Sequence, residues 1–421
     1  VYEGCEKMKI AVIGLGYVGL PLALAISKKY DNVIGINRTA EKADMINKRI
    51  LPIDDKQAEE DIKTTTLKAY SDFKYAEDSD IIILCVPTPI KKDKYPDLTP
   101  IVEASESILP YIKKGQLIIL ESTVNPGVSE EVILPILEKS GLKGGVDFDL
   151  SHCPERINPG DEKWNVYNIS RNVGSTSKEG CKRTADFYRS FLDAEINEMS
   201  SLKSAEATKI IENTFRDINI AYVNELAKSF DALGLDIIEV INGAKNKPFA
   251  FMAHYPGCGV GGHCIPVDPY YLIEKARSIG FDHKFLKIAR DVNNSMPGYT
   301  VDKLVAALNS IGLPVKGTKI LLLGLSYKAD IGDLRESPAL EIQQKLLDMG
   351  ADLTVADPFV KKDVDLTKAL ENNVAVILAT NHKEFLSIED WKNIKVIIDG
   401  KNCLNKEDIL SKGIIYKGIG R

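Results

Sequence analysis

Short apolar runs separated by longer amphipathic stretches fill the first two hundred residues of the chain. A glycine-rich turn at 14–19 and a helical stretch at 20–30 lie between the first two runs. Short runs that are apolar throughout are typical of parallel strands buried on both faces. The pattern therefore predicts β-α-β units in an open parallel sheet with helices on both faces. The predicted strands are residues 9–13, 32–36, 80–86 and 117–121.

The middle third of the sequence has a helical pattern. Residues 202–233 contain neither Gly nor Pro, and apolar residues recur there at helical spacing, which predicts one long helix. Apolar residues around much of its circumference need more cover than one chain supplies, so we predict a homodimer built on this helix. A second helix is expected at 286–308, after a Gly- and Pro-rich segment at 248–269 that predicts an elaborate loop.

After a linker at 312–317 the first pattern returns, but without a glycine-rich fingerprint. A helix is predicted at 338–349, and a nucleotide bound here would be held differently from one bound at the first turn. The predicted strands are 319–323, 352–356, 374–379 and 396–399. The fold class is thus α/β, with Rossmann-like doubly wound domains at 1–200 and 313–421 joined by a central helical domain at 201–312.

Composition and charge exclude several classes of protein. The 421 residues are 44% hydrophobic and 27% charged, and their net charge of −6, with both signs interspersed, argues against a general nucleic-acid binder. No apolar run approaches the ~20 residues that span a bilayer, and residues 1–8 lack the apolar core of a signal peptide. Seven scattered cysteines without CxxC spacing predict neither a disulfide framework nor a metal site. We therefore expect a cytoplasmic protein with no membrane partner.

The first turn fits the GxGxxG pattern of dinucleotide-binding domains, directly after a strand and at the start of a helix. Gly14 permits the tight turn, Gly16 lets the backbone approach a pyrophosphate, and Gly19 allows close packing of helix on strand. The alternative is a tight turn that binds nothing.

The second strand is followed by Asn37 and Arg38, where an acid usually binds the adenosine ribose. A neutral Asn beside an Arg does not repel a 2′-phosphate, so NADP is possible as well as NAD. Asn37 can still bond a free ribose hydroxyl, and the alternative for Arg38 is an ordinary solvated side chain.

Cys264 is the one cysteine in suggestive surroundings, because the glycines before it would let a substrate approach the thiol. The alternatives are a small buried hydrophobe at 264 and an ordinary helix cap at Asp268. On the long helix, Lys209, Asn213 and Arg216 share one face, which is either a solvent-facing stripe or a site for an oxyanion or diphosphate.

Seven segments together resemble the UDP-glucose and UDP-N-acetylhexosamine 6-dehydrogenase family over essentially the whole chain. They are GLGYVGLP at Gly14, VPTP at Val86, EST at Glu121, PERINPG at Pro154, EATKIIENTFRDINIA at Glu206, GVGGHCIPVDPYYL at Gly259 and GLSYKADIGDLRESPA at Gly324. The resemblance implies two successive NAD-dependent oxidations of the C6 alcohol of a UDP-sugar, through a covalent adduct on a cysteine. The product would serve surface polysaccharide or glycan precursor synthesis.

The resemblance also implies roles for individual residues. Cys264 would be the nucleophile, Lys209 and Asn213 would hold oxyanions, Asp268 would help to activate water, and Thr123 and Glu155 would support proton transfer. Matching cofactor-contacting positions are Tyr17, Val18, Thr88, Thr123 and Arg335, beside the glycine turn. Matching substrate-contacting positions are Glu155, Arg156, Lys209, Asn213, Phe251, His254, Tyr255, Gly257, Gly261 and Lys328.

The GGHC form and the segment KPFAFMAHYPG at Lys247 are more similar to the N-acetylhexosamine branch, particularly to UDP-N-acetylglucosamine enzymes. UDP-glucose and UDP-N-acetylmannosamine are the alternative substrates. Ala253, His254 and Cys258 stand where close relatives often have Pro, an aromatic residue and Pro, so the sequence defines the reaction better than the sugar. Two other functions stay open: a hydroxyacid-type dehydrogenase that needs no thiol, and a dinucleotide-binding sensor without turnover.

Overall fold

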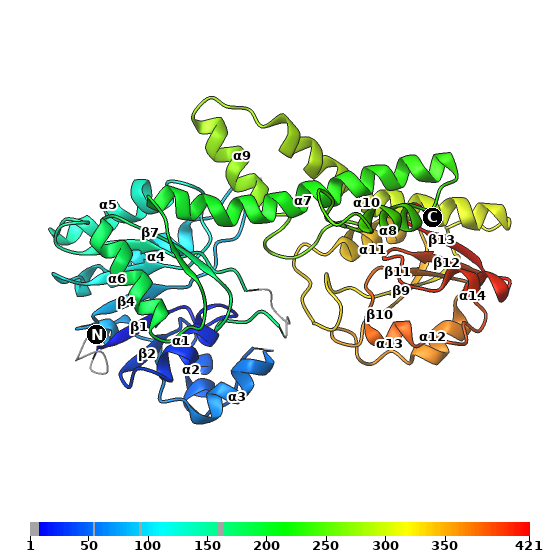
Figure 1. Cartoon of the computed structure of the whole chain (residues 1–421). Helices are drawn as coiled ribbons and strands as arrows, with labels where there is room; N and C mark the ends of the chain where they lie inside the picture. Colours follow the sequence, from blue (N-terminus) through cyan, green and yellow to red (C-terminus); the bar gives the residue numbers. More distant parts are fainter. Residues whose placement is uncertain (1–7, 54, 92–94, 158–162) are drawn as a thin grey trace. The chain divides into compact units, whose positions relative to one another are not determined.

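The computed structural model describes residues 8–53, 55–91, 95–157 and 163–421 (Figure 1). The chain divides into two compact units. The first comprises the residues up to Glu212 together with Tyr270–Ser278, and the second comprises Asn213–Pro269 and Ile279–Arg421. Residues 1–7, which include Cys5, and the end of the PERINPG segment lie outside the described residues.

The sheet of the first unit has eight strands in the order β3-β2-β1-β4-β5-β6-β7-β8. Its pairs are parallel except for β6 with β7, which are antiparallel. The sequence predicted a parallel sheet, and this edge is where the structure differs, as is common in large doubly wound sheets. The strands are β1 (Ile10–Ile13), β2 (Val33–Ile36), β3 (Lys68–Tyr70), β4 (Ile81–Leu84), β5 (Leu117–Leu120), β6 (Asp149–His152), β7 (Arg171–Ser175) and β8 (Ile196–Glu198).

Successive residues of these strands enter two different cores, which explains why the strands are apolar throughout. Ile10 and Val12 pack with α1, α2, α3 and α6 on one face, while Ala11 and Ile13 pack with α4 and α5 on the other (Figure 1). The helices are α1 (Gly19–Ser27), α2 (Ala40–Asn47), α3 (Lys56–Thr64), α4 (Thr99–Ile108), α5 (Leu134–Leu137) and α6 (Lys178–Arg189).

The second unit is built on a parallel sheet of five strands in the order β10-β9-β11-β12-β13. Helices α10 and α11 cover one face, and α12, α13 and α14 cover the other. The strands are β9 (Lys319–Leu323), β10 (Asp352–Ala356), β11 (Ala375–Leu378), β12 (Val396–Asp399) and β13 (Ile415–Gly418). The helices are α10 (Lys284–Ser310), α11 (Pro338–Asp348), α12 (Leu366–Asn372), α13 (Lys383–Leu386) and α14 (Lys406–Ser411).

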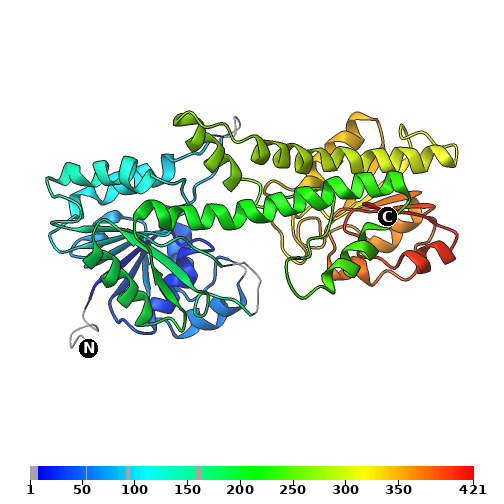
Figure 2. The same ribbon diagram turned by 45° about the horizontal axis from the view of Figure 1, so that its top comes forward.

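Helix α7 (Leu202–Leu233) is continuous and has the bounds that the sequence predicted (Figure 2). In the first unit, the carboxylate of Glu206 accepts hydrogen bonds from the amides of Gly127 and Ser129. In the second unit, Asp217 pairs with Arg290 of α10. Helices α8 (Ile237–Lys245) and α9 (Asp268–Ser278) follow.

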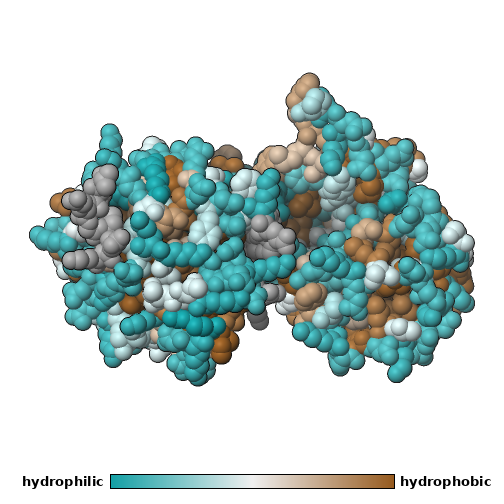
Figure 3. Space-filling model, turned by 60° about the horizontal axis from the view of Figure 1, so that its bottom comes forward, coloured by the Kyte–Doolittle hydropathy of each residue, from teal (hydrophilic) through white to brown (hydrophobic). Residues whose placement is uncertain are grey.

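No helix of the described residues is long and apolar enough to cross a membrane. On the face drawn in Figure 3, hydrophilic residues cover most of the surface and hydrophobic ones lie in patches between them. The apolar residues of the strands are buried in the cores on the two faces of each sheet.

Candidate active site

The glycine turn between β1 and α1 has the geometry of a dinucleotide site. Gly14 has a φ of +93°, and a Cβ there would lie 2.6 Å from the carbonyl oxygen of Cys85. A Cβ on Gly19 would lie 2.0 Å from the carbonyl oxygen of Gly14, so only glycine permits this packing. At Gly16, by contrast, nothing lies within 4 Å of an added Cβ, which leaves the backbone open to a ligand. The residues present fit a dinucleotide, because the start of α1 also presents amides to an anion.

Tyr17 and Val18 complete the turn and precede α1; Tyr17 is exposed and Val18 is half-buried. Asn37 lies beside the turn, where its Oδ1 accepts a long hydrogen bond, 3.4 Å, from the amide of Leu15. The neighbouring Arg38 is exposed. Asn37 therefore lies next to the glycine turn, and its hydrogen bond with the turn is weak.

Thr88 and Thr123 lie in the loops that follow β4 and β5. The hydroxyl of Thr88 donates to the carbonyl oxygen of Thr123 at 2.6 Å, and Tyr271 of α9 donates to the carbonyl oxygen of Thr88. These two residues and the glycine turn therefore share the carboxyl edge of the sheet, where open α/β sheets bind ligands.

A buried charge cluster adjoins Glu155 and was not predicted from the sequence. Arg171 on β7 is 1% exposed and donates to Glu121 at 2.8 Å, while its other terminal nitrogen lies 3.8 Å from Glu155 Oε2. Tyr188 also donates to Glu121. Burial raises the pKa of Glu121, Arg171 opposes this effect, and Glu155 adds to it. Glu121 was visible in the EST segment, but Arg171 belongs to no motif that would have revealed it.

Arg156 faces helix α7. Its guanidinium lies 2.7 Å from Glu212 and donates to the carbonyl and hydroxyl oxygens of Ser170. Lys209, one turn earlier on α7, is only 9% exposed, and Asn213 is 6% exposed. Arg216 is exposed. The alternative of a solvent-facing stripe therefore fails for Lys209 and Asn213, which are buried, and holds only for Arg216.

In the second unit, Cys264 is exposed, whereas Cys258 is buried. The alternative of a buried hydrophobe at 264 is therefore wrong. The carbonyl oxygen of Cys264 accepts from the amides of Val267 and Asp268, at 3.1 and 2.9 Å, so the thiol-bearing residue lies directly before the first turn of α9.

Asp268, the first residue of α9, is 3% exposed. The amide nitrogen of Asn213 donates to its carboxylate at 2.6 Å. This bond orients the carboxylate and leaves the second N–H of the Asn213 amide to serve another acceptor. A buried amide–carboxylate pair thus lies one helical turn after Cys264.

The segment before Cys264 rests on α7 and α8. Tyr255 donates to Asn242 at 2.9 Å, and the amide of Gly257 donates to Asn224 at 3.0 Å. The ring of His254 meets that of Phe215 edge-on. Phe251 is 37% exposed. The loop is therefore pinned at Gly257 and leaves an aromatic side chain accessible.

The loop after β9 contacts the Cys264 segment. The amide of Gly262 donates to the carbonyl oxygen of Arg335 at 3.0 Å, and a Cβ on Gly261 would lie 2.7 Å from Tyr327. The side chain of Arg335 pairs with Asp333, which raises the pKa of Arg335. Lys328 lies in the same loop and is half-buried.

The predicted residues thus form two groups, one on each unit. The first unit holds Gly14, Gly16, Tyr17, Val18, Gly19, Asn37, Arg38, Thr88, Thr123, Glu155, Arg156 and Lys209, and the second holds Asn213, Phe251, His254, Tyr255, Gly257, Gly261, Cys264, Asp268, Lys328 and Arg335. Across the part of the chain that the structure describes, no group of three or more His, Cys, Asp or Glu could hold a metal ion.

Three family models match consecutive parts of the chain. They are the NAD binding domain, the central domain and the UDP binding domain of the UDP-glucose/GDP-mannose dehydrogenase family, at residues 8–192, 203–295 and 321–406. Together they cover most of the sequence and agree in order with the two sheets and the helical segment between them.

Individual relatives are similar over nearly their whole length. The UDP-N-acetyl-D-glucosamine 6-dehydrogenase of Pseudomonas aeruginosa is 39% identical over 390 residues, which cover 90% of this chain and 92% of the relative. The UDP-N-acetyl-D-mannosamine dehydrogenase of Pyrococcus horikoshii is 36% identical over 426 residues, covering 98% and 99%.

A solved structure of the UDP-D-ManNAc dehydrogenase from Pyrococcus horikoshii superposes with a TM-score of 0.92 at 34% identity, over 98% of this chain and 99% of that one. The glycine turn, the sheet order and the family matches all indicate the same family. The resemblance found in the sequence is confirmed: the chain belongs to the UDP-glucose/GDP-mannose dehydrogenase family of NAD-dependent oxidoreductases.

Proposed function

We propose that this protein oxidises the C6 alcohol of a UDP-N-acetylhexosamine, UDP-N-acetylglucosamine in the first instance, to the uronic acid. The observation that carries the proposal is the exposed Cys264 on its glycine-rich loop, one turn before the buried Asn213–Asp268 pair. The names of the Pseudomonas aeruginosa and Pyrococcus horikoshii relatives support an N-acetylhexosamine. UDP-N-acetylmannosamine is the second candidate, because the relative with that name covers almost the whole chain.

The chemistry needs two oxidations and one hydrolysis. NAD, when bound, accepts a hydride in each oxidation. After the first, the thiolate of Cys264 adds to the C6 aldehyde, and the resulting oxyanion is stabilised by the cation of Lys209 and the amide of Asn213. Loss of the second hydride leaves a thioester on Cys264. Water then attacks the thioester carbonyl, the thiolate leaves, and the carboxylate is released.

Acid–base groups complete the assignment. Asp268 accepts the proton of the attacking water, and its bond from Asn213 fixes the orientation of the carboxylate for that task. Thr123 and Glu155 support loss of the alcohol proton in the first oxidation. Lys328, Arg156 and the 249–257 loop hold the UDP-sugar. We assign the cofactor to a domain at 1–200 and the UDP to one at 313–421, with 201–312 between them.

Turnover with a panel of UDP-sugars tests the proposal. The purified protein with NAD should form two NADH per uronic acid, with a higher kcat/KM for an N-acetylhexosamine than for UDP-glucose. An equal or higher kcat/KM for UDP-glucose would overturn the substrate assignment. One NADH per substrate without acid formation would favour a hydroxyacid-type dehydrogenase, and binding without turnover would favour a sensor.

We also propose a homodimer formed through α7. Apolar side chains at Ile211, Phe215 and Tyr222 recur along this helix and are 61%, 46% and 57% exposed. A second copy would cover them. Light scattering should give twice the chain mass of 46.4 kDa, and a mass of one chain would reject the dimer.

We propose that the protein acts in the cytoplasm, because a reducing compartment keeps the thiol of Cys264 from forming disulfides.

A further inference from the structure

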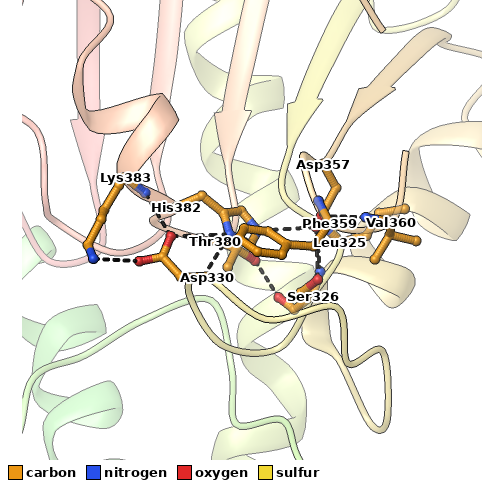
Figure 4. Close-up of polar contacts among 9 residues, drawn as sticks. All are labelled: Leu325, Ser326, Asp330, Asp357, Phe359, Val360, Thr380, His382 and Lys383. Atoms are coloured by element: carbon orange, nitrogen blue, oxygen red, sulfur yellow. Dashed lines mark hydrogen bonds and ion pairs between the residues drawn. The ribbon is translucent and has the colours of Figure 1, made fainter. Parts of the chain in front are cut away.

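The turn after β9 is closed by a carboxylate of the chain itself. Asp357 directly follows β10, and its Oδ2 accepts hydrogen bonds from the amides of Leu325 and Ser326 at 2.8 and 2.9 Å (Figure 4). The hydroxyl of Ser326 adds a third at 3.0 Å, and His382 Nε2 a fourth at 3.2 Å. The carboxylate is 1% exposed, so these donors have no competing water.

The second oxygen of Asp357 is also satisfied. Oδ1 accepts from the amides of Phe359 and Val360, at 2.9 and 3.1 Å. Burial alone would raise the pKa of Asp357, but the hydrogen bonds from His382 and the amides outweigh it and hold the pKa below its usual range. The charged carboxylate is therefore a fixed part of this turn.

His382 connects the carboxylate to the far side of the same loop. Its Nδ1 accepts from the amide of Asp330 at 2.9 Å, so the ring proton lies on Nε2 and is donated to Asp357. The ring is fully buried between Phe359, with which it stacks, and Phe385, which it meets edge-on. The imidazole of His382 thus connects Asp357 to Asp330, which lies four residues beyond Ser326 in the loop.

Further contacts fix the start of the loop. The hydroxyl of Thr380 donates to the carbonyl oxygen of Ser326. Gly324 has a φ of +90°, and a Cβ there would lie 2.4 Å from Thr380. Residues 324–330 are therefore bonded both to Asp357, which follows β10, and to Thr380 and His382, which follow β11.

The other end of this loop forms the support of the Cys264 segment. The carbonyl oxygen of Arg335 accepts from the amide of Gly262, two residues before Cys264. Gly262 has a φ of +93°, and a Cβ there would lie 2.8 Å from the ring of Tyr327. A displacement of the loop would therefore move the backbone that carries the thiol.

We propose that Asp357 and His382 are positioning residues for the reaction at Cys264. They hold the 324–335 loop, which bears Lys328, against Gly261 and Gly262, and so fix the place of the thiol-bearing segment. The inference rests on the proposed function only in the choice of Cys264 as the reacting group. A small displacement of such a group is sufficient to cost a large factor in rate.

The test compares two variants of His382 in the full-length chain. His382→Phe keeps an aromatic ring but removes both hydrogen bonds, whereas His382→Gln retains a donor and an acceptor. Leu370→Ala is the control, because Leu370 of α12 is buried in the apolar core that also contains Phe385, so its truncation destabilises the same unit without removing a hydrogen bond of His382. Urea unfolding establishes that all variants are folded under the assay conditions.

Two measurements are made on each variant. Hydrogen exchange follows the peptide that contains the amide of Gly262. Steady-state kinetics gives kcat and the KM values for UDP-sugar and NAD. His382→Phe should speed exchange at Gly262 and lower kcat by about 10-fold to 100-fold with little change in the KM for NAD. His382→Gln should recover much of the loss, and Leu370→Ala should leave both exchange at Gly262 and kcat near wild type.

Unchanged exchange at Gly262 and an unchanged kcat in His382→Phe would overturn the inference. So would an equal effect of Leu370→Ala, since it would show only a general loss of stability. If the wild-type chain oxidises none of the UDP-sugars, the proposed function fails, and exchange at Gly262 still decides whether His382 holds the Cys264 segment.

Discussion

The turns that follow β1 and β9 are built alike but are used differently. Gly14 and Gly324 have φ values of +93° and +90°, and each amide donates to the last residue of the neighbouring strand at 2.8 Å. The residue after that strand is Asn37 in the first unit and Asp357 in the second. Asn37 accepts one hydrogen bond of 3.4 Å from an amide of its turn, whereas Asp357 accepts hydrogen bonds from two amides of its turn, at 2.8 and 2.9 Å.

The side chain that follows the neighbouring strand thus determines how many amides of the turn are bonded within the chain. The neutral Asn37 takes only the amide of Leu15, through a long bond, and the absence of a side chain at Gly16 leaves room for a pyrophosphate. In the second unit the carboxylate of Asp357 stands where the first has Asn37, and Ser326, at the position equivalent to Gly16, binds it as well. The turn after β1, here called the open turn, is thus suited to a ligand. The turn after β9, the closed turn, is suited to holding its own loop.

The largest effect should come from changes of Cys264, whose segment contacts the loop that contains the closed turn. Cys264→Ala should lower uronic acid formation by at least about 1,000-fold, because the nucleophile is lost, while the NAD affinity of the open turn stays near wild type. Cys264→Ser should form an adduct but stall, since an alkoxide is a poorer leaving group than a thiolate, and mass spectrometry should detect the trapped ester. Near-normal acid production by either variant would show that Cys264 is not the nucleophile.

The next effect concerns the open turn itself. Gly16→Val should weaken NAD binding by about 100-fold, because the side chain takes the space of the pyrophosphate. The fold should tolerate it, since nothing lies within 4 Å of the added Cβ. Isothermal titration with NAD and thermal unfolding measure the two properties. Wild-type NAD affinity in this variant would place the cofactor away from the turn.

A change to the closed turn should act on stability. Asp357→Asn should lower the free energy of unfolding by about 1–3 kcal/mol, as it replaces a charged acceptor of buried amides by a neutral amide. The folded pKa of Asp357 lies below the ordinary 3.8, so its contribution is present above that pH and is lost as the pH falls further. Urea unfolding between neutral and acid pH should show a weaker acid dependence in the variant. Equal dependence in both proteins would contradict this account.

The smallest effect should come from making the first turn more like the second. Asn37→Asp should lower the NADP-to-NAD ratio of kcat/KM by about 10-fold through repulsion of the 2′-phosphate. A parallel loss of NAD affinity would show instead that the new carboxylate has bound the amide of Leu15 and closed the turn. An unchanged ratio would place position 37 away from the ribose.

Elements governed by local pattern were predictable. The bounds of α7 agree with the sequence at both ends because 32 residues without Gly or Pro have a single helical interpretation. The strands β1, β2, β4, β5, β9, β10, β11 and β12 were predicted because a short apolar run marks each of them. The three-residue strands β3 and β8 are too short to leave such a pattern, and the antiparallel pairing of β7 depends on how the chain returns to the sheet.

Interactions between distant residues were not predictable. Arg171 and Glu121 are fifty positions apart, and His382 reaches Asp330 across a similar interval. Neither pair has a spacing that a single sequence reveals. The glycine turn and Cys264 could be singled out because local neighbours mark them, whereas a buried ion pair is recognised only once the fold brings its members together.

The exposure of the cysteines has a practical consequence for labelling the enzyme in mixtures. Of the cysteines at described positions, Cys264 alone is exposed, and burial raises the pKa of Cys85, Cys153 and Cys258. Because electrophiles react with accessible thiolates, a haloacetamide carrying a reporter should mark this protein mainly at Cys264. Subtracting the signal of Cys264→Ala removes any contribution of Cys5. On the proposed function, a bound UDP-sugar would shield Cys264 and reduce the labelling, so the label at this residue would report site occupancy when compounds are screened in crude extracts.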